Sequence, residues 1–224
     1  MVERVLYVSA SPRGKRSLSS QIAEDLLIAF GTQKEIEIDH LDPWKCNLPE
    51  VDGDLLAAKY AGLAEESLSP EQIDAWNQIK ELAQRFYAAD ILLFSVPLWN
   101  FGIPYKLKHL IDVISHKGIL FSFDGSDLSG LLGGRRAIVI YTRGLGYDID
   151  SQTPDDCFGL EKLYLDTWFQ FVGVTKVHSL VVENTLGSLG STIRNSSNET
   201  VNLLMQSVNS DVSQSIVLGR DKKM

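Results

Sequence analysis

Short apolar runs that alternate with helix-spaced segments constrain the fold of this chain more than any other feature. The clearest unit starts at residues 91–95, Ile-Leu-Leu-Phe-Ser, an apolar run typical of a strand buried on both faces. After Pro104, which suits the first turn of a helix, the apolar residues within 107–111 fall on one helical face. A strand followed by a loop and a helix is the repeating unit of a parallel sheet covered by helices.

The same pattern recurs along the chain and defines the expected fold class. The expected strands are residues 5–8, 35–41, 91–95, 136–141 and 176–182, and the expected helices cover about 20–30, 71–88, 104–116, 158–171 and 191–208, with a short helix near 54–62 and a small hairpin edge at 121–123. We therefore expect an α/β protein with a doubly wound, five-stranded parallel sheet in flavodoxin-like order 2-1-3-4-5 and three αβα layers. A truncated Rossmann sheet stays an alternative, although the GxGxxG fingerprint is absent after the first strand.

Composition narrows the class of protein and its partners. The 224 residues contain no repeat or linker, so we expect one domain over 1–224, and 44% hydrophobic residues can form a sizeable core. A net charge of −8 argues against nucleic-acid and membrane partners. Neither Cys46 nor Cys157 belongs to a CxxC pair, so a zinc site or disulfide framework is not expected. The opening apolar run is too short for a signal peptide or membrane span, which favours a cytoplasmic location.

A serine-rich loop between the first strand and the first helix is the first candidate binding element. Ser11, Ser17 and Ser19 offer hydroxyl groups beside the free backbone amides at the start of a helix. Because such amides and the helix dipole favour an anion, the loop suits a single phosphate group. The alternative is that the hydroxyls only cap the helix, for which Ser19 or Ser20 is the expected capping residue.

Two more loops follow strands whose carboxyl ends lie at the same edge of a parallel sheet. Residues 97–104 contain two prolines, an aromatic pair and an asparagine, a composition suited to a flat, partly apolar ring beside backbone amides. In residues 142–146, Thr-Arg-Gly-Leu-Gly, the glycines would allow close backbone approach, and Arg143 would place positive charge near an electron-rich ring. Either loop alone could be a plain turn, but three loops at one edge indicate a ligand site.

Other side chains give no sign of metal or nucleophilic chemistry. His109 and His116 lack the i, i+4 spacing of a helical zinc site. Ser9 and Ser11 lie outside the G-x-S-x-G pattern of a hydrolase. We therefore assign no catalytic side chain and no metal ligand.

Several longer motifs carry a resemblance to a known family. They are P-L-W-N-F-x-I-P-x-x-L-K-x-x-I-D over 97–112, G-I-L-F-S-F over 118–123 and T-R-G over 142–144. With these motifs the chain resembles the FMN-dependent NADH-azoreductases, also described as quinone reductases of the flavodoxin-like fold. The resemblance covers Val5 to about Val182. It implies a bound FMN, NADH or NADPH as donor, and two-electron reduction of quinones or aromatic azo compounds by a ping-pong mechanism.

The resemblance also implies a role for individual residues. The matched cofactor-binding positions are Ser11, Ser17, Leu18 and Ser19 for the phosphate, Pro97, Leu98, Trp99, Asn100 and Phe101 for the ring, and Thr142, Arg143, Gly144 and Leu145 for the pyrimidine end. Phe121 and Phe171 match aromatic positions that line the substrate face. Members of the family are homodimers with the active site at the interface, so a homodimer is expected here.

Three departures from the family pattern are visible. Trp99 stands where relatives often have tyrosine, and Leu145 where they often have glycine, with Gly146 one position later. The segment 184–224 is longer and more polar than the resemblance predicts. Two other functions stay open: a flavodoxin-like electron carrier without its own nicotinamide site, and a flavin-less binding module that has kept the fold.

Overall fold

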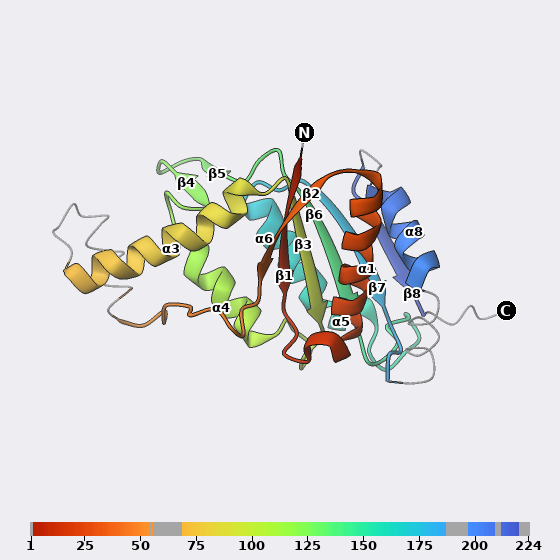
Figure 1. The fold of residues 1–224 in the computed structure, drawn as a ribbon. Coiled ribbons are helices and arrows are strands. Elements are labelled where there is room, and N and C mark those ends of the chain that lie inside the picture. Colours follow the sequence, from red (N-terminus) through yellow and green to blue (C-terminus); the bar gives the residue numbers. More distant parts are fainter. Residues whose placement is uncertain (1, 54, 56–68, 187–196, 209–211, 220–224) are drawn as a thin grey trace.

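A six-stranded parallel sheet of order β2-β1-β3-β6-β7-β8 forms the centre of the protein (Figure 1). The computed structural model describes residues 2–53, 55, 69–186, 197–208 and 212–219. The strands are β1 (Glu3–Ser9), β2 (Ile36–Leu41), β3 (Ile91–Pro97), β6 (Arg136–Thr142), β7 (Lys176–Val182) and β8 (Ser215–Leu218). The first five in spatial order follow the predicted flavodoxin-like arrangement. The expected number of five strands is wrong, because β8 extends the sheet beyond β7.

The sixth strand lies in the segment to which sequence reasoning assigned no role. β8 is only four residues long, Ser-Ile-Val-Leu, and a short run at a sheet edge gives too little periodicity to distinguish it from a loop. Its pairing with residues 179–182 of β7 fixes it in the sheet. The expected helix at 191–208 is found as α8 (Ser197–Val208), and its first residues, 191–196, lie outside the described part of the chain. The short helix expected near 54–62 lies outside it as well, except for residue 55.

Helices cover both faces of the sheet, as the three-layer expectation requires. α1 (Leu18–Gln33) and α8 cover one face, while α3 (Pro70–Ala88), α4 (Tyr105–Ile114) and α6 (Leu160–Phe171) cover the other; the short helices are η1 (Gly14–Arg16) and α5 (Asp155–Phe158). Along β3, Leu93 packs in the core beneath α1, while Leu92 and Phe94 pack in the opposite core. A strand buried on both faces is what a continuous apolar run predicts.

The helix over 71–88 begins with a reciprocal cap. Ser69 Oγ accepts a hydrogen bond from Gln72 N (3.3 Å), and the Gln72 side chain accepts one from Ser69 N (2.9 Å). Pro70 fits the first helical position, where no backbone donor is needed. Among the helices of the described ranges, none combines the length and apolar character needed to cross a membrane.

A small hairpin lies outside the main sheet. β4 (Phe121–Phe123) pairs antiparallel with β5 (Leu128–Gly130), which confirms the hairpin edge expected from the sequence. The hairpin comes between the end of α4 and the start of β6. It therefore lies at the amino-terminal edge of the sheet, opposite the loops that follow β1, β3 and β6 (Figure 1).

Candidate functional site

The loops after β1, β3 and β6 meet at the carboxyl edge of the sheet, where their bases are joined by backbone hydrogen bonds. Ala10 N donates to Ser95 O (3.0 Å), and Leu98 N donates to Thr142 O (2.9 Å). We call these loops the carboxyl rim; they comprise residues 10–17, 97–104 and 142–147. The carboxyl edge of an open parallel sheet is the usual place for a ligand. The structure thus brings the three sequence-predicted loops together.

The serine loop of the rim holds its hydroxyl groups in the interior. Ser11, Ser17 and Ser19 are all buried, and Ser17 Oγ lies 3.1 Å from Ser19 Oγ. The expectation that Ser19 or Ser20 caps the helix is wrong, because α1 begins at Leu18 and its cap residue is Ser17. Ser17 makes no side-chain capping bond. Its hydroxyl and the first-turn amides therefore fit an anion such as a phosphate.

The loop after β3 contains a strained turn that the sequence did not reveal. Trp99 and Gly102 exchange two backbone hydrogen bonds of 2.9 Å each. Between them Asn100 has φ +47° and Phe101 has φ +66°. Two consecutive positive φ values define a type I′ turn, in which asparagine is well tolerated. A phenylalanine there costs roughly 1–2 kcal/mol, and such strain concentrates at functional sites.

Aromatic side chains from several elements gather around this turn. The Phe101 and Phe158 rings lie 5.3 Å apart, and the Trp99 and Trp44 rings lie 5.6 Å apart. Trp44 Nε1 also donates to Ala10 O (2.9 Å), which ties it to the serine loop. Sequence reasoning missed Trp44 and Phe158, which lie outside the three loops but contact the aromatic side chains of the turn. Trp44 could have been found, because it follows β2, whose carboxyl end lies at the same edge.

The side chain of Arg143 lies in the interior of the protein, which corrects the expectation of a positive charge beside a ring. Arg143 is 1% exposed; its Nε donates to Glu161 (2.5 Å) and its Nη1 to Asp155 (2.6 Å) and Glu183 (3.1 Å). Its guanidinium also lies 4.3 Å from the centre of the Tyr147 ring. Burial raises the pKa of Glu161, although the ion pair with Arg143 opposes this rise.

The two glycines of this loop make room for other parts of the chain. A Cβ on Gly144 would lie 2.9 Å from the side chain of Leu186, and one on Gly146 would lie 3.0 Å from the side chain of Asn184. The spacing Gly-Leu-Gly therefore serves internal packing, where the sequence had suggested close approach to a ligand. Leu145, between them, is 51% exposed. Its side chain is available at the rim.

Phe121 and Phe171 lie together but far from the rim. Their rings are 4.7 Å apart. Phe121 belongs to the hairpin at the amino edge, and Phe171 ends α6 just before β7 begins. A strand of seven residues such as β6 separates the two edges by about 20 Å. Within one chain, therefore, this pair does not line the same site as the three loops.

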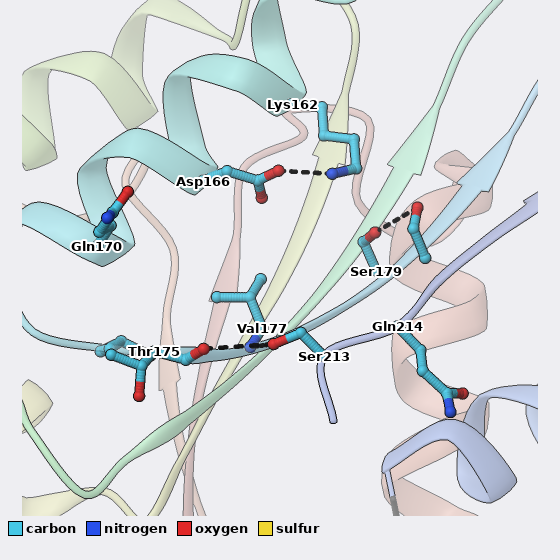
Figure 2. Close-up of a pocket in the computed structure, with 10 residues that line it drawn as sticks. Lys162, Asp166, Gln170, Thr175, Val177, Ser179, Ser213 and Gln214 are labelled. Carbon is cyan, nitrogen blue, oxygen red and sulfur yellow. Dashed lines mark hydrogen bonds and ion pairs between the residues drawn. The ribbon is translucent and has the colours of Figure 1, made fainter. Parts of the chain in front are cut away.

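A cavity of about 410 Å³ opens at the amino ends of β7 and β8 (Figure 2). Lys162 and Asp166 of α6 form an ion pair of 2.5 Å on one side of it. On the other side, Ser179 Oγ donates to Ser215 Oγ (2.9 Å). No predicted site residue lines this cavity. Across the described ranges, no group of histidine, cysteine and acidic side chains could hold a metal ion.

The fold and the joined loops define a flavodoxin-like α/β protein with a candidate ligand site at the carboxyl rim. A family model described as "Flavodoxin-like fold" matches residues 3–201. The chain is 48% identical over 192 residues to "FMN-dependent NADH:quinone oxidoreductase 9" of Burkholderia lata, a match that covers 85% of this chain and 91% of the relative. It is 44% identical over 185 residues to "FMN-dependent NADH:quinone oxidoreductase 3" of Pseudomonas fluorescens, covering 82% and 86%.

A solved structure supports the fold independently. It is described as a FMN-dependent NADH-azoreductase from Bacillus anthracis in complex with FMN, and it superposes with a TM-score of 0.79 at 23% identity. The match covers 92% of this chain and 99% of that chain. The chain therefore belongs to the flavodoxin-like family of FMN-dependent NADH:quinone oxidoreductases.

Proposed function

We propose that this protein binds FMN at the carboxyl rim and passes two electrons from NADH or NADPH to quinones. Reductive cleavage of aromatic azo compounds is the second proposed reaction of the same site. The observation that carries the proposal is that three βα loops meet at the carboxyl edge of the sheet. These loops contain the serine cradle, which we define as the buried Ser11 and Ser17 with Ser19, and the strained turn at Asn100 and Phe101. The names of the curated relatives support the same cofactor and substrate class.

The residues at the rim fit FMN in two separate ways. Ser17 is the cap residue of α1 but makes no side-chain capping bond, so Ser11, Ser17 and Ser19, together with the first-turn amides from Leu18 onward, can hold one phosphate. The ring would lie against Pro97, Leu98, Trp99, Asn100 and Phe101 and reach the backbone of Thr142, Arg143, Gly144 and Leu145. When bound, FMN supplies the two-electron redox chemistry, and the chain supplies binding, orientation and charge.

In this proposal, Phe121 and Phe171 contribute to the site of a second copy of the chain. One chain does not bring them to the rim, because they lie at the opposite edge of the sheet. Side chains around them, Phe123, Leu128 and Leu131, are substantially exposed. We infer a homodimer in which this aromatic edge of one copy covers the rim of the other and forms the substrate face there.

The proposed kinetic scheme is ping-pong. The nucleotide and the acceptor would bind in turn to the same face of the FMN ring, because the rim would cover the other face. We place the reaction in the cytoplasm, a reducing compartment in which Cys46 and Cys157 persist as free thiols.

A titration with FMN followed by a turnover assay tests the function. The protein should bind one FMN per chain and then oxidise NADH or NADPH in the presence of a soluble quinone. Initial rates at several fixed quinone concentrations should give parallel double-reciprocal lines. A chain that binds no FMN, or that binds FMN but supports no nucleotide oxidation with either a quinone or an azo dye, contradicts the proposal.

A further inference from the structure

The side chain of Arg143, which directly follows β6, contacts three other elements beneath the carboxyl rim. It reaches Asp155 at the start of α5, Glu161 at the start of α6 and Glu183 just beyond the end of β7. These contacts are 2.6, 2.5 and 3.1 Å long. All of these elements end or begin at the same edge of the sheet, so one guanidinium spans the base of the candidate site.

The same cluster holds the backbone of the rim loop that carries Arg143. Glu183 Oε2 accepts a hydrogen bond from Tyr147 N (3.0 Å), while its Oε1 accepts one from Arg143. The carbonyl oxygen of Arg143 accepts from both Thr185 N (3.0 Å) and Thr185 Oγ1 (2.9 Å). Each end of the loop 143–147 is thereby attached to the segment that follows β7.

Most of the cluster is removed from solvent. Arg143 contacts three carboxylates, and Glu161 and Glu183 are 0% exposed. Within the described residues, Arg143 Nη2 and Glu161 Oε2 are buried without a hydrogen-bond partner. Buried ion pairs of this kind contribute little net stability compared with apolar packing. Their presence at the base of a candidate ligand site indicates a role in the geometry of the loop.

We propose that Arg143, Asp155, Glu161 and Glu183 form a clamp that positions residues 143–147 toward bound FMN. This Arg143 clamp deepens the proposed function and rests on it. Arg143 is then a positioning residue whose guanidinium does not touch the cofactor.

Four substitutions test whether the contacts of Arg143 position the loop. In Glu183→Gln only one amide oxygen remains to accept the bonds from Arg143 and Tyr147, so one bond is lost. In Arg143→Lys the charge stays, but a single ammonium cannot serve three carboxylates as a planar fork does. Glu161→Gln keeps its acceptor oxygen and removes one charge. Asp155→Asn is the milder variant, because Asp155 is 43% exposed.

Hydrogen exchange of amides 143–147 in FMN-free protein and FMN titration are the first two measurements. We expect at least tenfold faster exchange and at least tenfold weaker FMN binding for Glu183→Gln and Arg143→Lys, and about threefold effects for Asp155→Asn. Glu161→Gln keeps an acceptor oxygen for Arg143, so it should change exchange and FMN affinity less than threefold.

Asp166→Asn is the matched control, since Asp166 lies on the same helix in a partly buried ion pair with Lys162, away from Arg143. It should leave exchange and FMN affinity unchanged. Wild-type exchange and FMN affinity in Glu183→Gln and Arg143→Lys would overturn the clamp. If the buried variants fail to fold, unchanged exchange in folded Asp155→Asn overturns it as well. A wild-type protein that does not bind FMN contradicts the proposed function instead, while the exchange experiment still tests the clamp.

Discussion

The two edges of the sheet are built differently, and the contrast separates what one chain can do from what two chains can do. The carboxyl rim is internally constrained by hydrogen bonds between loops, a strained turn and a buried ionic cluster. The amino edge carries a short hairpin and the Phe121–Phe171 pair, with exposed apolar side chains beside it. A constrained rim suits a tightly held cofactor, whereas an exposed apolar edge suits contact with another surface.

The largest effect on FMN binding should come from a negative charge placed in the serine cradle of the carboxyl rim. In Ser17→Asp the carboxylate would repel the FMN phosphate, while aspartate still serves as a good cap for α1 and preserves the fold. We expect at least a hundredfold loss of FMN affinity by fluorescence titration. Ser17→Ala, the control without charge, should lose only about tenfold. Unchanged binding by Ser17→Asp would mean that the phosphate lies elsewhere.

A substitution at the amino edge should lower activity toward the quinone and leave FMN binding unchanged. In Phe121→Ala, FMN affinity should stay within twofold of wild type, while kcat/KM for a quinone should fall about tenfold, because the substrate face loses a ring. Ile28→Ala, an exposed apolar residue on α1, is the control and should change neither quantity. A loss of FMN affinity without any change in quinone kinetics would contradict the assignment of Phe121 to the substrate face.

A smaller effect separates the role of the backbone turn at Asn100 from the role of the Asn100 side chain. Asn100→Gly keeps a backbone that accepts φ +47°, whereas Asn100→Ala adds a strain of about 1 kcal/mol. If the turn is what matters, FMN affinity should fall about fivefold in the alanine variant and hardly change in the glycine variant. Equal losses in both would assign the effect to the Asn100 amide group. Wild-type affinity in both variants would remove Asn100 from the cofactor site.

Sequence patterns located the sheet and the three loops because both depend on local order. Apolar runs mark buried strands, and a parallel sheet places every βα loop at one edge. The patterns failed where the decisive contact is distant in sequence. The burial of Arg143 depends on Glu161 and Glu183, and the glycine spacing depends on Asn184 and Leu186. Neither relation leaves a periodic signal in the sequence.

The Phe121–Phe171 pair shows a different limit. The structure places the two rings 4.7 Å apart. The resemblance implied that both rings line a substrate face, but residue type alone does not reveal on which edge of the sheet they lie. That follows from topology, because the hairpin comes before β6 and Phe171 comes before β7. β8 was missed for a third reason, since four residues at a sheet edge are too few for a pattern.

The smallest expected effect concerns stability. His178 on β7 is buried, with Nδ1 3.2 Å from Ser207 Oγ of α8, and burial together with Arg136 and Lys176 lowers its pKa. The unfolded chain therefore takes up a proton near pH 6.5, while the folded protein takes it up only at lower pH. Stability should fall as the pH drops from about 6.5 through the folded-state pKa of His178.

His178→Gln should show a smaller fall in melting temperature between pH 7.5 and pH 5.5 than the wild type. His40→Gln is the comparison variant. His40 lies on β2, the strand at the other edge of the sheet, and its ring bonds to Ser9 of β1. An equal fall in wild type and His178→Gln would show that His178 does not carry this pH dependence.

Anaerobic reduction of the FMN-loaded protein by NADH shows most directly whether the protein accepts electrons from a nicotinamide. NADH or NADPH should bleach the flavin absorbance, and a quinone, added after the nucleotide is exhausted, should restore it. Ser17→Asp should give no bleaching under the same conditions, because no flavin is held. If FMN bound to the wild-type protein stays oxidised with both nucleotides, yet is reduced by dithionite, the protein is an electron carrier without its own nicotinamide site and the proposed function is wrong.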